Sequence, residues 1–215
     1  MSKPRIIFYF DCVSTFSYIG FEFMERYRRL WNIDVDYRPI ILVEALIASK
    51  NMISLNKLEY LFHDVSRVSA ITKIPFKSVP DKHPYDSTVV LRTLQYLKTH
   101  HPDKLVPAMR QIWQTTFVEL IVLESVDSVK KALEGIVDAN MVDLAIASDN
   151  TLNAIKKNLS EAREVKGFGT PTIVVYKTSD SKPEMYFGSD RFEHIAIYLE
   201  KEYYPMKQLF ANAKV

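Results

Sequence analysis

The chain has 215 residues, of which 47% are hydrophobic and 25% charged, a composition typical of a soluble globular protein with a sizeable core. Its 28 basic and 26 acidic residues are mixed along the chain without a basic stripe, so we expect no nucleic-acid binding. The single cysteine, Cys12, excludes an intrachain disulfide and favours a reducing compartment. No apolar stretch approaches the length of about 20 residues that is needed to span a bilayer. We also find no signal-peptide pattern. An intracellular protein that does not enter a membrane is expected.

The first 40 residues predict a strand, a helix and a second strand. Residues 6–10 are a wholly apolar run, typical of a strand buried on both faces. Residues 16–31 carry apolar side chains at helical spacing, and either Ser14 or Ser17 can cap the start of that helix. Residues 35–40 alternate as a second strand, which completes the length of a right-handed crossover unit.

The middle of the chain is helical in pattern. Amphipathic stripes cover residues 55–74, 86–101, 104–116, 126–139, 142–148 and 152–166, and many of them are separated by prolines or turn residues. None of the five glycines lies between Gly20 and Gly135, which favours helices over a β-rich domain. We predict an inserted all-helical domain over residues 46–165.

The end of the chain returns to strands. Residues 172–176 and 184–187 flank a polar turn and predict a hairpin, and Ser189 is the expected N-cap of a helix from 191 to about 201. The whole order predicts an α/β, thioredoxin-like fold with an inserted all-helical domain. Its thioredoxin-like part is discontinuous and covers residues 1–45 and 166–215. Other α/β folds can begin with the same order.

Three segments that are distant in sequence would meet in such a fold. They are residues 11–18 after the first strand, 167–171 before the third strand, and 188–190 before the last helix. Open α/β sheets place ligands at the carboxyl ends of their strands. We therefore expect a ligand site where these segments converge.

Four stretches of the sequence carry a family resemblance. They are FYFDCVSTFSYIGFE (8–22), RLWNIDVDYRP (29–39), FGTPTIVV (168–175) and YFGSDRFEHIAIYL (186–199). Together they resemble the kappa-class glutathione transferases, which are related to the bacterial DsbA-like disulfide oxidoreductases and to 2-hydroxychromene-2-carboxylate isomerases. The helical middle matches more loosely, in length and character.

The resemblance implies a glutathione transferase in which Ser14 matches the catalytic serine. It implies glutathione-binding roles for Ser14, Thr15, Phe16, Asn51, Thr170, Pro171, Ser189 and Asp190, with Ser17 and Arg191 in support. The backbone of Thr170, before an expected cis-Pro171, would pair with the cysteinyl unit, and Ser189 and Asp190 would hold the γ-glutamyl end. One departure is that the family's proline-rich loop after Asn51 is replaced by residues 52–57 and shortened.

The resemblance also implies glutathione as co-substrate without a permanent cofactor, a small electrophilic substrate and a homodimer. It implies a mitochondrial or peroxisomal location, although the cytosol is not excluded. The chain end Ala213-Lys214-Val215 is an imperfect relative of the peroxisomal signal S-K-L.

Elementary energetics agree with a thiol-activating role for Ser14. A free thiol has a pKa of about 8.5, and lowering it by about 2 requires roughly 2.7 kcal/mol of preferential thiolate stabilisation. A hydroxyl that donates to an anion contributes about 1.5–3 kcal/mol, and a helix N-terminus adds up to about 2 kcal/mol. No general base is needed.

Simpler interpretations remain open for each residue. Ser14 and Ser189 alone are ordinary helix caps, Pro171 can be trans, and Cys12 is most simply an inert buried thiol. A serine hydrolase is disfavoured because no G-x-S-x-G elbow occurs, and we find no metal-ligand spacing. The aromatic residues are mostly expected in the core, although Phe16, Tyr18 and Trp113 can line an electrophile pocket.

Two other functions compete with the transferase. One is a glutathione-dependent isomerase of the chromene-carboxylate type that uses the same serine. The other is a non-catalytic thioredoxin-like binding or chaperone module. A disulfide oxidoreductase is disfavoured because Ser14 and Ser17 stand where thiols would be needed.

Overall fold

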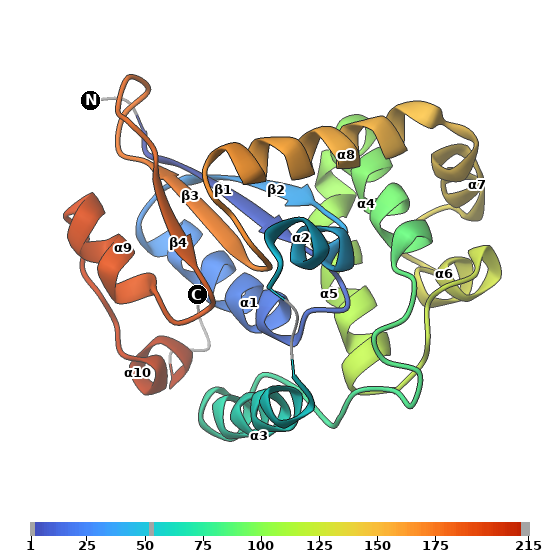
Figure 1. The fold of residues 1–215 in the computed structure, drawn as a ribbon, viewed down its shortest axis with the longest axis horizontal. Helices are drawn as coiled ribbons and strands as arrows, with labels where there is room; N and C mark the ends of the chain where they lie inside the picture. Colours follow the sequence, from blue (N-terminus) through green and yellow to red (C-terminus); the bar gives the residue numbers. More distant parts are fainter. Residues whose placement is uncertain (1–2, 52–53, 212–215) are drawn as a thin grey trace.

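A four-stranded sheet organises the computed structural model, which describes residues 3–51 and 54–211. The strands are β1 (Arg5–Phe10), β2 (Asp34–Pro39), β3 (Thr172–Tyr176) and β4 (Glu184–Phe187), in the order β2-β1-β3-β4. Strands β1 and β2 are parallel, whereas β3 is antiparallel to both β1 and β4 (Figure 1). The predicted crossover unit and C-terminal hairpin are therefore confirmed.

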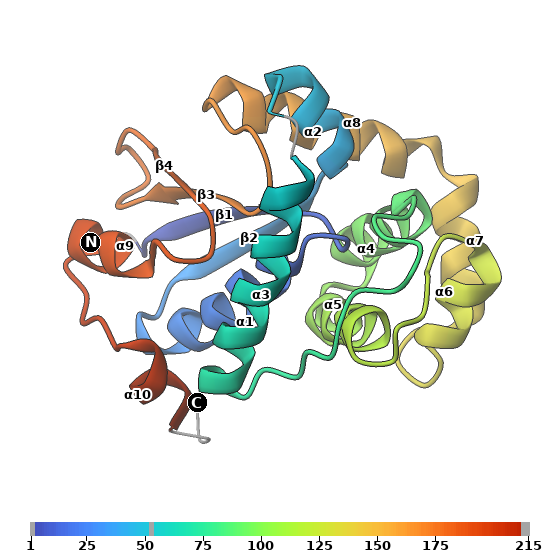
Figure 2. The ribbon, with the colours of Figure 1, turned by 60° about the horizontal axis from the view of Figure 1, so that its bottom comes forward.

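Alternation along β1 divides the core between the two faces of the sheet. Ile6, Phe8 and Phe10 belong to the main core, which includes residues of α1 (Thr15–Leu30) and α9 (Phe192–Leu199). Ile7 and Tyr9 face a second cluster with residues of α2 (Leu42–Ser49) and α8 (Asp149–Glu164). Figure 2 shows α2 and α8 on one side of the sheet and α1 on the other. β1 is thus buried on both faces, as its apolar run predicted.

The remaining helices lie beyond the sheet. Four of them gather on the side of α8 that is farther from β4: α4 (Thr88–His100), α5 (Pro102–Phe117), α6 (Val126–Ala132) and α7 (Ala139–Ala147) (Figure 1). α3 (Leu55–Thr72) contacts α1 and the last helix, α10 (Met206–Ala211). The proposed domain bounds, 1–45 and 166–215 around 46–165, stay a prediction.

Several predicted element bounds are wrong, each for a local reason. The helix expected over 126–139 ends at Ala132, because the chain turns through Gly135 at φ +78°, and α7 begins three residues earlier than predicted, after its Asp138 cap. Ser189 is not the N-cap of the last predicted helix, because α9 begins at Phe192 with Arg191 at the cap position.

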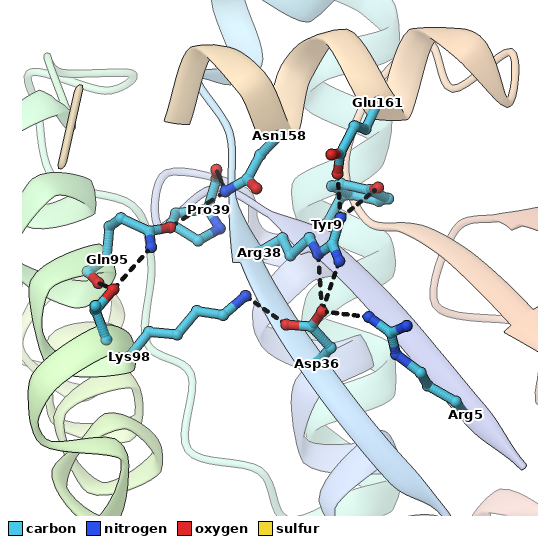
Figure 3. Close-up of polar contacts among 10 residues, drawn as sticks. Arg5, Tyr9, Asp36, Arg38, Pro39, Gln95, Lys98, Asn158 and Glu161 are labelled. Carbon is cyan, nitrogen blue, oxygen red and sulfur yellow. Dashed lines mark hydrogen bonds and ion pairs between the residues drawn. The ribbon is translucent and has the colours of Figure 1, made fainter. Parts of the chain in front are cut away.

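A polar seam joins the helices to the edge strand β2. The carboxylate of Asp36 pairs with Arg5 at 2.9 Å, with Arg38 at 2.8 Å, and with Lys98 of α4, while Arg38 also pairs with Glu161 of α8 (Figure 3). Burial acts to raise the pKa of Asp36, but Lys98 and Arg38 outweigh it and hold that pKa below its ordinary value. The ionised Asp36 carboxylate therefore fastens α4 to the sheet, and Arg38 fastens α8.

Candidate active site

Ser14 lies between the end of β1 and the start of α1, where its backbone is extended (φ −87°, ψ 112°). Its Oγ accepts a hydrogen bond from the Ser17 amide at 3.1 Å, so the predicted N-cap is confirmed. The 16-residue helix that follows has no acidic residue in its first turn. The positive end of its dipole is therefore available to an anion beside Ser14.

The three segments predicted to converge are linked by hydrogen bonds, with the proline loop between the other two. The Ser14 hydroxyl donates to the carbonyl oxygen of Thr170 at 3.2 Å, across 156 positions of sequence. The Thr170–Pro171 peptide bond is cis, as predicted. The amide of Gly188 donates to the Pro171 carbonyl at 3.0 Å, which brings the third segment against the second. The strand-end turn is thus bonded to the proline loop, and the proline loop to the approach to α9.

Two further hydroxyls beside Ser14 are buried without a partner. The Oγ of Ser17 and the Oγ1 of Thr170 make no hydrogen bond within the described part of the chain, and the two residues are only 0% and 8% exposed. Buried polar groups are normally paired, so each exception calls for an explanation. Because both oxygens are closed to solvent, a ligand could bond to them only after a local rearrangement.

A buried carboxylate underlies the turn that carries Ser14. Asp11 is 1% exposed and accepts hydrogen bonds from the amides of Leu42 at 2.7 Å and Val13 at 3.2 Å, and from the side chain of Ser87. Desolvation raises the pKa of Asp11 to about 6, although those hydrogen bonds oppose the rise. Asp11 thereby ties the turn to the first residue of α2 and to the N-cap of α4, a role that the sequence analysis missed.

Cys12 is buried, as the simpler interpretation held. Burial first, and the neighbouring Asp11 charge second, raise the pKa of its thiol well above the ordinary value. Because the thiolate is the nucleophilic form, this cysteine is poorly suited to react.

Asn51 follows α2 and lies against the proline loop. Its Nδ2 donates to the Phe168 carbonyl at 3.4 Å, and the hydroxyl of Ser49 reaches the same oxygen at 3.3 Å. The side chain therefore stands beside the predicted site, and its contact with glutathione stays a prediction. Residues 52 and 53 of the following loop lie outside the described residues.

The other predicted binding residues differ in exposure. Thr15 and Ser189 are buried and Phe16 is partly buried, whereas Asp190 and Arg191 are exposed and pair with each other at 2.9 Å. Gly188 before them has φ +97°, and a Cβ there would stand 2.8 Å from the Asp190 carboxylate. This turn therefore requires glycine.

The apolar surface near the site differs from the expected one. Tyr18 and Trp113 stack on each other with ring centroids 5.6 Å apart, and both are buried in the core, so their pocket-lining role is wrong. Phe168 and Phe187 instead pack at the proline loop, with ring centroids 4.2 Å apart. Ile47 on neighbouring α2 is 62% exposed.

Within residues 3–51 and 54–211 no group of three His, Cys, Asp or Glu side chains could hold a metal ion. No helix in the same ranges combines the length and the apolar composition needed to cross a membrane.

Comparison with protein families shows to which family this fold belongs. The model described as the DSBA-like thioredoxin domain matches residues 5–200, which include the whole sheet and all three converging segments. The chain belongs to this family. Membership in the DSBA-like thioredoxin domain family confirms the fold predicted from the order of elements.

Individual relatives of this DSBA-like chain are similar over nearly all of its length. Glutathione S-transferase kappa 1 of Rattus norvegicus is 28% identical, and the match covers 93% of each chain; the Homo sapiens protein of the same name is 26% identical over 90% of each. The solved structure of a 2-hydroxychromene-2-carboxylate isomerase has a TM-score of 0.71 at 22% identity, covering 91% of this chain and 94% of its own. The resemblance to kappa-class glutathione transferases is confirmed.

Proposed function

We propose that this protein is a glutathione transferase that conjugates glutathione to small apolar electrophiles, with the Ser14 hydroxyl stabilising the glutathione thiolate. The observation that carries the proposal is the position of Ser14. It caps an acid-free helix start and faces the Thr170 carbonyl across the proline loop. Relatives that bear the name of a kappa-class glutathione transferase support the same chemistry.

The electrostatics of the site favour a thiolate at Ser14. Lowering a thiol pKa by about 2 takes roughly 2.7 kcal/mol. One hydroxyl donor contributes about 1.5–3 kcal/mol and a partly buried helix N-terminus up to about 2 kcal/mol. The Asp11 charge opposes the thiolate, as it does at Cys12. Three backbone amides and the Ser87 side chain hydrogen-bond to the Asp11 carboxylate and offset part of its charge.

The tripeptide would lie across the three segments. The Thr170 backbone pairs with the cysteinyl unit in an extended, strand-like manner. The amides at Ser189 and Asp190 receive the γ-glutamyl carboxylate, and the exposed Asp190 carboxylate receives its ammonium group. Thr15, Phe16 and Asn51 border the sulfur, while Ser17 and Arg191 hold their neighbours in place.

In the reaction the thiol first loses its proton to solvent. The sulfur lone pair then forms the S–C bond with an electrophilic carbon, and the leaving group departs with the electron pair of the broken bond. We place the electrophile against Phe168, Phe187 and Ile47, the apolar side chains beside the loop. We also propose that the protein is a homodimer and is located in mitochondria or peroxisomes. Residues 213–215, which bear on the location, lie outside the described residues.

The isomerase remains a second candidate, because a chromene-carboxylate isomerase shares the fold with a TM-score of 0.71. Steady-state assays of both reactions separate the two. Conjugation of a chloride-substituted nitroaromatic at the uncatalysed rate, together with isomerase turnover, would favour the isomerase.

Calorimetric titration with glutathione addresses the alternative of a non-catalytic binding module. We expect saturable glutathione binding, and its absence would contradict both the transferase and the isomerase.

A further inference from the structure

Helix α2 has little of its own to hold its first turn. It is only eight residues long, and Ala45 is its one buried side chain. Helices this short are unstable in isolation, because few backbone bonds offset the cost of starting the helix. Ile41 at the N-cap position makes no side-chain capping bond. The free amides at the start of α2 therefore need acceptors from elsewhere in the chain.

Asp11 supplies such an acceptor from the strand-end turn. Its Oδ2 accepts the amide of Leu42, the first residue of α2, at 2.7 Å, although the two residues are 31 positions apart. A carboxylate is the partner that a helix N-terminus favours, through the hydrogen bond and through the helix dipole. The other oxygen, Oδ1, accepts the amide of Val13 at 3.2 Å, next to Ser14. One buried side chain thus joins the start of α2 to the turn that carries Ser14.

The far end of α2 contacts the proline loop. The hydroxyl of Ser49 and the Nδ2 of Asn51 both donate to the Phe168 carbonyl, at 3.3 Å and 3.4 Å. The Asn51 amide also bonds back to the Leu46 carbonyl at 3.0 Å, which fixes this residue to the end of the helix. α2 therefore runs from Asp11 at one end to the proline loop at the other, a rise of about 12 Å along its axis.

We propose that Asp11 is a positioning residue for the glutathione site and acts through α2. Its carboxylate caps the helix at one end, and the helix holds Asn51 and the proline loop in place at the other. This proposal rests on the proposed function and adds a residue that acts on binding rather than on the thiolate. Because Ser14 keeps its own bonds to the Ser17 amide and the Thr170 carbonyl, loss of the cap should weaken glutathione binding and leave thiolate stabilisation unchanged.

The amide of Leu42 can be removed without a change at Asp11. Proline lacks the N–H and is tolerated at the first position of a helix, and Ile41 before it has the extended backbone (φ −81°, ψ 112°) that proline favours in its predecessor. Leu42→Ala is the matched control, because it also removes the leucine side chain but keeps the N–H. By calorimetric titration, we expect the Kd of glutathione to be about fivefold higher in Leu42→Pro than in Leu42→Ala. Ultraviolet thiolate absorbance should give the same bound-thiol pKa in both variants.

Variants of Asp11 test the other partner of the same bond. Asp11→Ala removes the cap, whereas Asp11→Asn keeps one oxygen for the Leu42 amide. We expect the Kd of glutathione to rise about fivefold in Asp11→Ala and to stay within about twofold of the wild-type value in Asp11→Asn. Ser87→Ala removes another partner of the carboxylate but leaves the cap of α2, so its Kd should not change. Amide hydrogen exchange should accelerate in α2 of Leu42→Pro and Asp11→Ala.

Equal Kd values for Leu42→Pro and Leu42→Ala would overturn the proposal, whether or not α2 exchanged faster. If exchange accelerated throughout Leu42→Pro, the two Asp11 variants would decide, and equal Kd values for Asp11→Ala and Asp11→Asn would overturn it. A bound-thiol pKa that rose together with the Kd would also overturn it, because the cap would then act on the thiolate. An ordinary thiol pKa for glutathione bound to the wild type would instead refute the proposed function.

Discussion

The buried carboxylate of Asp11 makes a prediction about stability that can be worked from the structure. Its pKa of about 6 in the folded protein stands above the ordinary 3.8. A raised carboxyl pKa means that the folded state binds a proton more tightly than the unfolded state. Its contribution to stability is therefore fully present below about pH 4 and is lost as pH rises through about 6.

The size of the effect follows from the two pKa values. The difference of about 2.2, at 1.36 kcal/mol for each pKa unit, corresponds to about 3 kcal/mol. The Asp11→Asn variant keeps an oxygen that can accept the Leu42 amide, but it does not titrate. We expect the free energy of unfolding of the wild type, minus that of the variant, to fall by about 3 kcal/mol between about pH 3 and pH 8.

Urea denaturation of both proteins across this pH range measures the difference. Equal denaturant slopes would show that the unfolded states are comparable. Asp36→Asn provides a contrast, because the pKa of Asp36 is lowered and its pH dependence has the opposite sign. A wild-type minus Asp11→Asn difference that stayed constant, or that grew with pH, would refute the assignment of a desolvated carboxylate at Asp11.

Further predictions concern the seam and the binding turn. Asp36→Asn should cost about 2 kcal/mol of unfolding free energy near neutral pH, since it removes a charge bonded to Arg38 and Lys98. That loss should shrink as pH falls and Asp36 is protonated in the wild type. A difference in unfolding free energy that did not change with pH would contradict the stabilising role of the Asp36 ion pairs. Gly188→Ala should cost about 1 kcal/mol from its positive φ and also raise KM for glutathione. Gly135→Ala, at φ +78° with open space around it, is the control that loses stability and keeps KM. Asp190→Asn should raise KM for glutathione about twofold to fivefold with kcat unchanged, because the carboxylate is exposed and shared with Arg191; an equal fall in kcat would argue against a purely binding role.

The sequence predicted the fold and the core of the site because their signals are local. The apolar run of β1, the helical spacing after Ser14 and the β-branched run of β3 each report on one element, and the order of elements then determines the topology. The convergence of Ser14 with Thr170 followed from that topology together with the family resemblance.

Features that depend on long-range packing were missed. α2 is apolar on most of its surface, and Ile41 at its cap position makes no side-chain bond, so neither periodicity nor capping marked it. Asp11 looked like a strand end, because its partners Leu42 and Ser87 come from distant segments. Trp113 is buried in the core, although its aromatic character alone fitted a pocket equally well.

The central claim is that the Ser14 hydroxyl stabilises a thiolate at the start of α1. The most direct test is the pKa of bound glutathione, followed by ultraviolet thiolate absorbance in the wild type and in Ser14→Ala. Ser125→Ala is the matched control, because it removes another helix-capping hydroxyl, at α6. We predict a pKa well below the free value of about 8.5 in the wild type and the control, and a rise of about 1 to 2 in Ser14→Ala. An identical titration in all three proteins would contradict the mechanism.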